Sequence, residues 1–136
     1  MSIQQLSVFT QSEPGHLQRI VDLLQQQGIS VRGFSCSDTG DYGIVRLVVN
    51  NPSAAEQILT QAGMATTTTE VIALKLVDVP GELARVFTTL ANAGINVIYG
   101  YSLIATYIAI KVEAVTQAEA LLRQAGVELI SEQDLA

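Results

Sequence analysis

The sequence predicts an α+β protein built from two similar units in tandem, each with its elements in the order β-α-β-β-α-β. Two observations support this prediction. An internal repeat covers most of the 136 residues, and apolar residues recur with strand and helix periods at equivalent places in both copies. We expect the first unit to span residues 1–69 and the second residues 70–136.

The repeat is clearest around the first helix of each copy. The segment "EPGHLQRIVDLLQQQGISV" (13–31) aligns with "VPGELARVFTTLANAGINV" (79–97) at an offset of 66, and "SAAEQILTQAG" (53–63) aligns with "TQAEALLRQAG" (116–126) at an offset of 63. The first copy therefore has three additional residues between its second and third strands, in "CSDTGDYG". No linker separates the copies.

Each copy opens with a strand that leads into an amphipathic helix. Apolar residues alternate in the strand, at Leu6 and Val8 in the first copy and at Ile72, Leu74 and Leu76 in the second. The helix has an apolar stripe with the spacing i, i+3, i+4, i+7. This stripe comprises Leu17, Ile20, Val21 and Leu24 in the first copy and Leu83, Val86, Phe87 and Leu90 in the second. Gly28 and Gly94 follow, where a helix C-terminal glycine is expected.

The rest of each copy predicts two strands, a second helix and a final strand. The strands are expected at about 29–37 and 43–49 in the first copy, and at about 95–102 and 106–112 in the second. The second helix has equivalent apolar residues in both copies, namely Ala55, Ile58, Leu59 and Ala62, and Ala118, Leu121, Leu122 and Ala125. Short final strands are expected near 65–69 and 127–132. The order is that of a ferredoxin-like unit, with two helices on one face of an antiparallel sheet.

The junction between the copies, "MATTTTEVIALKLVD", contains no turn signal. We therefore expect a near-continuous extended segment from about Thr66 to Val77, with exchange of end strands between the halves as a further option. Units of this size bury little surface alone. A homodimer with four such units would cover the open sheet edges and the remaining apolar face.

The composition restricts the class of partner. The net charge of −6 argues against nucleic acid and anionic membranes as partners, because both favour a basic surface. The uncharged stretch of residues 94–110 contains Asn96 and Gly100 and fits two strands better than a membrane span. The single cysteine cannot form an internal disulfide, so the expected location is the cytoplasm.

The sequence offers little for catalysis or metal binding. Its one histidine, His16, falls in the first helix and is expected to be a solvated surface residue. Cys36 lies in a strand between two serines and is expected to be an inert thiol. No Cys-x-x-Cys pair and no acid–base pair is found. We therefore expect no enzyme activity, no metal site and no cofactor.

The strand–helix junction of the second copy, "DVPGEL", favours binding of a zwitterion. Backbone amides at a helix start are unpaired and attract a carboxylate. Asp78 could accept hydrogen bonds from an ammonium group, and Asn96 offers both a donor and an acceptor. Two structural alternatives stay open: Asp78 could instead cap the helix, and Asn96 could satisfy its own backbone.

The element order, the D-x-P-G-x-L motif and Gly-Ile-Asn-Val at the second strand resemble the ACT domain family, over nearly the whole chain and twice. This resemblance implies a free-standing tandem regulatory protein that binds an amino acid or a related small carboxylate at an interface between two domains. The residues carried over are Asp78, Val79, Pro80, Gly81, Leu83, Ile95, Asn96 and Val97.

In the first copy, serines replace the two polar positions, so a weaker or degenerate site is expected there. Its equivalent residues are Ser12, Pro14, Gly15 and Ser30. The resemblance also implies a partner enzyme of amino-acid metabolism. The alternative is an interaction module that docks on an enzyme without a small ligand.

Overall fold

The computed structural model describes residues 2–136, and these form two compact units. The N-terminal unit contains Gln4–Thr69 together with Leu135–Ala136. The C-terminal unit contains Glu70–Asp134 together with Ser2 and Ile3. The first residues of the chain thus belong to the C-terminal unit, and the last two residues belong to the N-terminal unit. The two units exchange these short end segments.

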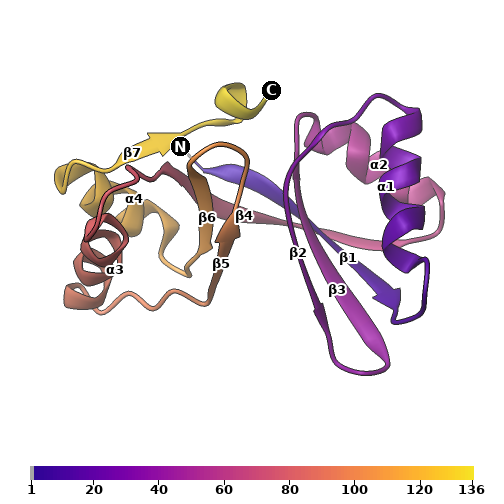
Figure 1. The fold of residues 1–136 in the computed structure, drawn as a ribbon, viewed down its shortest axis with the longest axis horizontal. Coiled ribbons are helices and arrows are strands. Elements are labelled where there is room, and N and C mark those ends of the chain that lie inside the picture. Colours follow the sequence, from indigo (N-terminus) through magenta and orange to yellow (C-terminus); the bar gives the residue numbers. More distant parts are fainter. Residues whose placement is uncertain (1) are drawn as a thin grey trace. The chain divides into compact units, whose positions relative to one another are not determined.

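Both copies have the predicted order of elements (Figure 1). The first comprises β1 (Ile3–Gln11), α1 (His16–Gln26), β2 (Val31–Asp38), β3 (Tyr42–Val49), α2 (Pro52–Gln61) and the beginning of β4 (Ala65–Lys75). The second comprises the end of β4, α3 (Glu82–Asn92), β5 (Tyr99–Ser102), β6 (Tyr107–Lys111), α4 (Val115–Gln124) and β7 (Glu128–Ile130), followed by a 3-10 helix (Glu132–Leu135).

The strands follow the order β2-β3-β1-β4-β6-β5, and β7 also pairs with β4. Within each copy this gives the same arrangement, in which the first strand lies between the last and the third, and the second strand lies at the edge. The strand pairs β1–β3, β2–β3, β4–β6, β4–β7 and β5–β6 are all antiparallel. The α+β fold with two ferredoxin-like units is thus confirmed.

Strand β4 runs without interruption from Ala65 to Lys75 and passes from one unit to the other between Thr69 and Glu70. The prediction of a continuous extended segment at the junction is confirmed, although the strand ends two residues before Val77. Because β4 is the last strand of one unit and the first of the next, each unit needs it to complete its sheet.

Each unit has its own core, and the cross-strand register is equivalent in the two. Leu6 pairs with Leu47 in the N-terminal unit, and Ile72 pairs with Ile110 in the C-terminal unit. Facing these strands, α1 buries Ile20 and Leu24 while α3 buries Val86 and Leu90. Removal of this apolar surface from water is the main favourable contribution to folding.

The four helices end in the way that the glycines predict. At the end of α1, Gly28 has φ 73°, Gly28 N–H donates to Gln25 O, and Ile29 N–H donates to Leu24 O. This pattern is the Schellman motif, in which a left-handed residue lets the chain reverse while it satisfies the last carbonyls. Gly63, Gly94 and Gly126 have equivalent bonds.

Two elements differ from the prediction. The second strand of the C-terminal unit was expected at about 95–102, but β5 begins only at Tyr99, and Ile95 and Val97 pack against the core before the strand begins. The final strand is also shorter than expected. It ends at Ile130, and Asp134 then accepts hydrogen bonds from Ser131 N (2.8 Å) and Ser131 Oγ (3.2 Å), which favours a 3-10 turn.

The second helices of the two copies, α2 and α4, differ in their N-terminal caps, and this difference gives a testable prediction. Asn51 Oδ1 accepts from Ala54 N at 3.2 Å at the start of α2, whereas Ala114 occupies the equivalent position before α4 without a side-chain cap. We expect Asn51→Ala to lower the free energy of unfolding by about 1 kcal/mol and Ala114→Asn to raise it by a similar or smaller amount. Urea denaturation measures both, and a loss below about 0.2 kcal/mol for Asn51→Ala would contradict the role of the cap.

Candidate functional site

The turn between the first strand and the first helix has the same backbone in both units. The N-cap residues are Gly15 and Gly81, with φ of 91° and 89°. Glycine is required here because other residues rarely adopt this left-handed conformation. The helices begin at the next residue, so Pro80 precedes the N-cap and lies outside the first helical turn. Gly81 is therefore explained by the backbone conformation alone.

Asp78 lies at the centre of a tight turn, in which Val79 N donates to Val77 O at 2.8 Å. Helix α3 has no side-chain cap hydrogen bond, so the alternative in which Asp78 serves only as the helix cap does not hold. Asp78, Val79, Pro80 and Gly81 are all exposed. The predicted residues of this turn thus form an exposed surface at the start of α3.

The other predicted residues of the C-terminal unit lie in two separate hollows. Leu83 and Val97 line one of about 270 Å³, against β5 and β6. Ile95 and Asn96 line another of about 360 Å³, next to the start of α4. Asp78, Val79, Pro80 and Gly81 are not among the lining residues of either hollow. The structure therefore places the predicted residues in three separate parts: an exposed turn at the start of α3, an apolar hollow against β5 and β6, and a second hollow beyond the end of α3.

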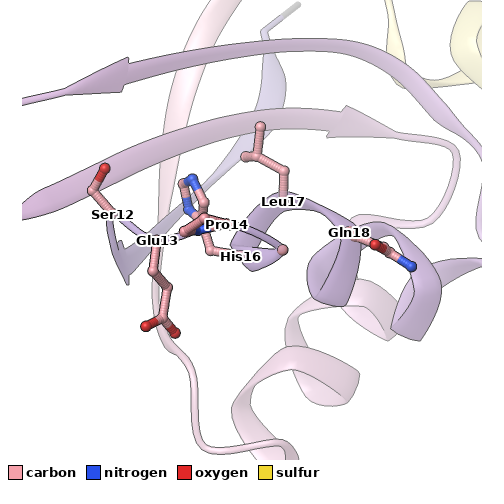
Figure 2. A pocket seen from close by; sticks show the side chains of 7 residues that line it. Ser12, Glu13, Pro14, His16, Leu17 and Gln18 are labelled. Atoms are coloured by element: carbon pink, nitrogen blue, oxygen red, sulfur yellow. The ribbon is translucent and has the colours of Figure 1, made fainter.

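The equivalent turn of the N-terminal unit borders a shallow hollow of about 490 Å³, lined by residues 12–18 (Figure 2). Ser12, Pro14 and Gly15 line it, as the sequence predicts for a second site. Ser30 is not among its lining residues. Ser30 N instead donates to Asn50 Oδ1 at 2.9 Å.

His16 is half-buried at this turn, so the expectation of a solvated surface residue was wrong. Its ring lies against Gly43, where an added Cβ would come within 3.1 Å of His16 Cε1. His16 Nδ1 is buried and has no hydrogen-bond partner among residues 2–136. The small glycine on β3 therefore makes room for the imidazole, which the sequence alone did not indicate.

Asp38 lies beside Ser12 of this turn and was missed by the sequence analysis. Ser12 Oγ donates to Asp38 Oδ2, and Gly40 N donates to Asp38 Oδ1 at 2.6 Å. These bonds, from Ser12 first and Gly40 second, hold the pKa of Asp38 below its ordinary value of 3.8, with a smaller contribution from the charge of His16. Asp38 lies in "CSDTGDYG", the segment with the three additional residues of the first copy. This difference in length between the copies was the sequence feature that could have indicated Asp38.

The first helix of each unit contains an arginine that forms an ion pair with a glutamate close to the strand–helix turn. Arg85 binds Glu82, with Nη2–Oε1 at 2.5 Å, and its Nη1 also donates to Ala125 O at the end of α4. The hydrogen bonds from Arg85 lower the pKa of Glu82. In the N-terminal unit, Arg19 Nη2 lies 3.0 Å from Glu13 Oε1. Glu82 at the start of α3 is thus paired, which reduces its repulsion of an anion at the helix start.

The described residues hold no group of three or more His, Cys, Asp and Glu side chains placed to bind a metal ion. Across residues 2–136, no helix is both long and apolar enough to cross a membrane.

The pKa of Asp38 provides a test of the first turn. We expect Ser12→Ala to raise the pKa of Asp38 toward its ordinary value of 3.8 because the main hydrogen bond to the carboxylate is lost. A lowered pKa in the folded state stabilises the protein above pH 3.8, and this stability is lost as the pH falls through the folded pKa. Carboxyl-carbon NMR titration measures the shift. Ser37→Ala is the control, and an equal effect of both variants would contradict the assignment.

Arg85 and Arg19 form a matched pair for a second test. We expect Arg85→Ala to lower the free energy of unfolding, because it removes a charged hydrogen bond between two helices that is partly screened by solvent. Arg19→Ala should have a smaller effect, since its ion pair is exposed and links no second helix. Thermal unfolding of both variants decides this, and equal losses would show that the Ala125 contact contributes nothing.

Comparison with known proteins identifies relatives of the whole chain. A family model described as "ACT domain pair" matches residues 1–136. The crystal structure of protein BT0572 from Bacteroides thetaiotaomicron is 27% identical, with a TM-score of 0.94 over 99% of this chain and 96% of that one. No curated protein matches the sequence.

Two further solved structures are regulatory subunits. The ligand-free regulatory subunit of aspartate kinase from Thermus thermophilus is 19% identical, with a TM-score of 0.67 over 90% of this chain and 89% of that one. The corresponding subunit from Thermus flavus is 18% identical, with a TM-score of 0.64 over 90% of each chain. At these identities, the likeness concerns the fold.

Proposed function

This chain belongs to the ACT domain pair family, and we propose that it is a regulatory protein that binds a free amino acid or a related small carboxylate. The observation that carries the proposal is the turn at the start of α3, where exposed Asp78 lies next to a helix start formed by Gly81. The helix start attracts a carboxylate, and Asp78 can accept hydrogen bonds from an ammonium group. A free amino acid carries both groups.

The pairing of Glu82 supports this assignment. An unpaired carboxylate in the first turn of α3 would repel the ligand's carboxylate and would compete for the helix amides. Arg85 neutralises that charge at a distance of 2.5 Å and holds it toward the end of α4. The helix start therefore keeps its favourable interaction with an anionic ligand.

The C-terminal unit is the better candidate for the site. Its ligand residues would be Asp78, Val79, Pro80, Gly81, Leu83, Ile95, Asn96 and Val97. In the N-terminal unit, Ser12 already binds Asp38 and Ser30 N binds Asn50, so both groups have protein partners. We propose a degenerate, structural site there.

We further propose that the protein is a cytoplasmic homodimer and that ligand binding changes an interface with an enzyme of amino-acid metabolism, without catalysis by this chain. The relatives that are regulatory subunits of aspartate kinase support this class of partner. The acidic net charge of −6 is consistent with a protein or small-molecule partner and disfavours nucleic acid and membrane.

A thermal-shift panel of all amino acids and their 2-oxo acids tests the proposed ligand. A ligand present at 100 times its dissociation constant should stabilise the folded state by about 2.7 kcal/mol, because it binds only that state. We expect Asp78→Ala and Asn96→Ala to abolish this shift while the melting temperature without ligand stays within about 2 °C.

The matched controls are Ser12→Ala and Ser30→Ala, the equivalent positions of the first copy, which should preserve the shift. If no compound at millimolar concentration moves the melting curve, the ligand-free interaction module replaces the sensor. Equal losses in both pairs of variants would instead show that the first copy holds a working site.

A further inference from the structure

The apolar hollow of about 270 Å³ in the C-terminal unit begins beside the start of α3. Leu83, the second residue of this helix, lines the hollow, and Phe87 lines it one helical turn further along. Helical side chains lean toward the N-terminus of their helix, so the side chain of Leu83 reaches back toward the turn that contains Pro80 and Gly81. The hollow is therefore adjacent to the place where the carboxylate of the ligand is proposed to bind.

The lining of this hollow favours an apolar occupant. Besides the two residues of α3, it includes Val97, Ile108 and Ile110. None of the described residues that line it carries a charge. A charged group would lose its hydration here without a partner, whereas burial of an apolar group is favourable. Leu83 and Phe87 are each 41% exposed, so apolar surface is left for an occupant to cover.

Gly100 of β5 keeps the hollow open, and the first copy has a phenylalanine in its place. The repeat aligns Gly100 with Phe34 at the offset of 66. Gly100 pairs with Ile110 and Phe34 pairs with Leu47. Both partners belong to the cores, and directly opposed residues point to the same face of a sheet, so both positions lie on the face that the helices cover. The hollow at α1 is lined by residues 12–18 and does not extend onto β2 or β3.

We propose that the hollow at Gly100 binds the side chain of the free amino acid, and that the ligand therefore has a large apolar side chain, as leucine, isoleucine, methionine and phenylalanine do. The inference rests on the proposed function, which places the ligand's carboxylate at the start of α3 and its ammonium group at Asp78. Leu83 and Phe87 lie about 6 Å apart along the helix, since each residue rises about 1.5 Å. A side chain that contacts both must extend beyond a single methyl group. The volume is slightly below the range of small-molecule pockets, about 300–1,000 Å³, and suits one such side chain.

Size and charge both discriminate between amino acids at this hollow. Alanine would leave most of it unfilled, and the loss of one methylene in an apolar pocket weakens binding about tenfold or more. Aspartate and lysine would bring a charge against Phe87 and Ile110, with no opposite charge among the described residues of the lining. The site therefore selects for the apolar surface of the side chain as well as for the two charged groups that all free amino acids share.

Isothermal titration calorimetry of the full chain with single amino acids tests this selectivity. We expect the preferred ligand among leucine, isoleucine, methionine and phenylalanine to bind at least tenfold tighter than alanine, aspartate and lysine. A smaller difference would overturn the inference and leave the amino-acid sensor in place. Absence of binding by every amino acid would instead refute the proposed function, and this inference with it.

Phe87→Ala and Val21→Ala form a matched pair that locates the ligand's side chain. Phe87 lines the hollow, and Val21 is its equivalent on α1 with a similar exposure, 43% against 41%. We expect Phe87→Ala to reduce the preference for the apolar amino acid over alanine at least threefold, because apolar contacts are lost, while the affinity for alanine stays within twofold. Val21→Ala should leave both affinities within twofold, and circular dichroism checks that each variant is folded.

Ser102→Leu is an independent variant that fills the hollow instead of enlarging it. Ser102 lines the hollow and is exposed, and it pairs with Ile108, so the two side chains point to the same face. We expect this variant to weaken binding of the preferred amino acid at least tenfold, with alanine again within twofold. If either folded variant leaves the preference over alanine unchanged, the ligand's side chain does not bind in this hollow and the inference is overturned, which leaves the hollow free for a side chain of a partner protein.

Discussion

The whole structure depends on one strand that belongs to both copies. β4 runs unbroken from Ala65 to Lys75 and changes units between Thr69 and Glu70. Its first part pairs within the N-terminal unit, and its last part lies between β6 and β7. A sheet that lacked this strand would expose backbone donors and acceptors and would lose a row of core residues. Neither unit can therefore complete its sheet without β4, which is the last strand of the N-terminal unit and the first strand of the C-terminal unit.

This constraint explains which features the two copies keep and which differ. The glycines at both strand–helix turns remain because the backbone there is left-handed, and those after the helices remain for the same reason. Positions where the backbone does not require glycine can carry different side chains in the two copies. Ser12 and Asp78 occupy one such equivalent position, and Phe34 and Gly100 occupy another. Divergence at these places lets one copy keep a structural polar cluster while the other presents an exposed acidic turn.

The sequence was sufficient to predict the parts of the fold that follow from periodicity. The stripes of α1 and α3 and the missing turn signal before Glu70 led to the element order and to the continuous strand. The shorter β5 was not predictable, because Ile95 and Val97 fit an alternating strand equally well until the core is seen. For the candidate site, the sequence located the turn but missed Asp38 and the Arg85 contact to Ala125, since both join residues far apart in the chain.

The most direct measurement is hydrogen–deuterium exchange resolved along β4. If the strand is shared by both units, the amides of residues 67–74 that donate to a neighbouring strand should be protected far above those of the turn at Gly40, with no gap at the change of units. Global unfolding would then be the main route to their exchange. Fast exchange confined to Thr69, Glu70 and Val71 would contradict the account, because it would show two separate strands joined by a loop.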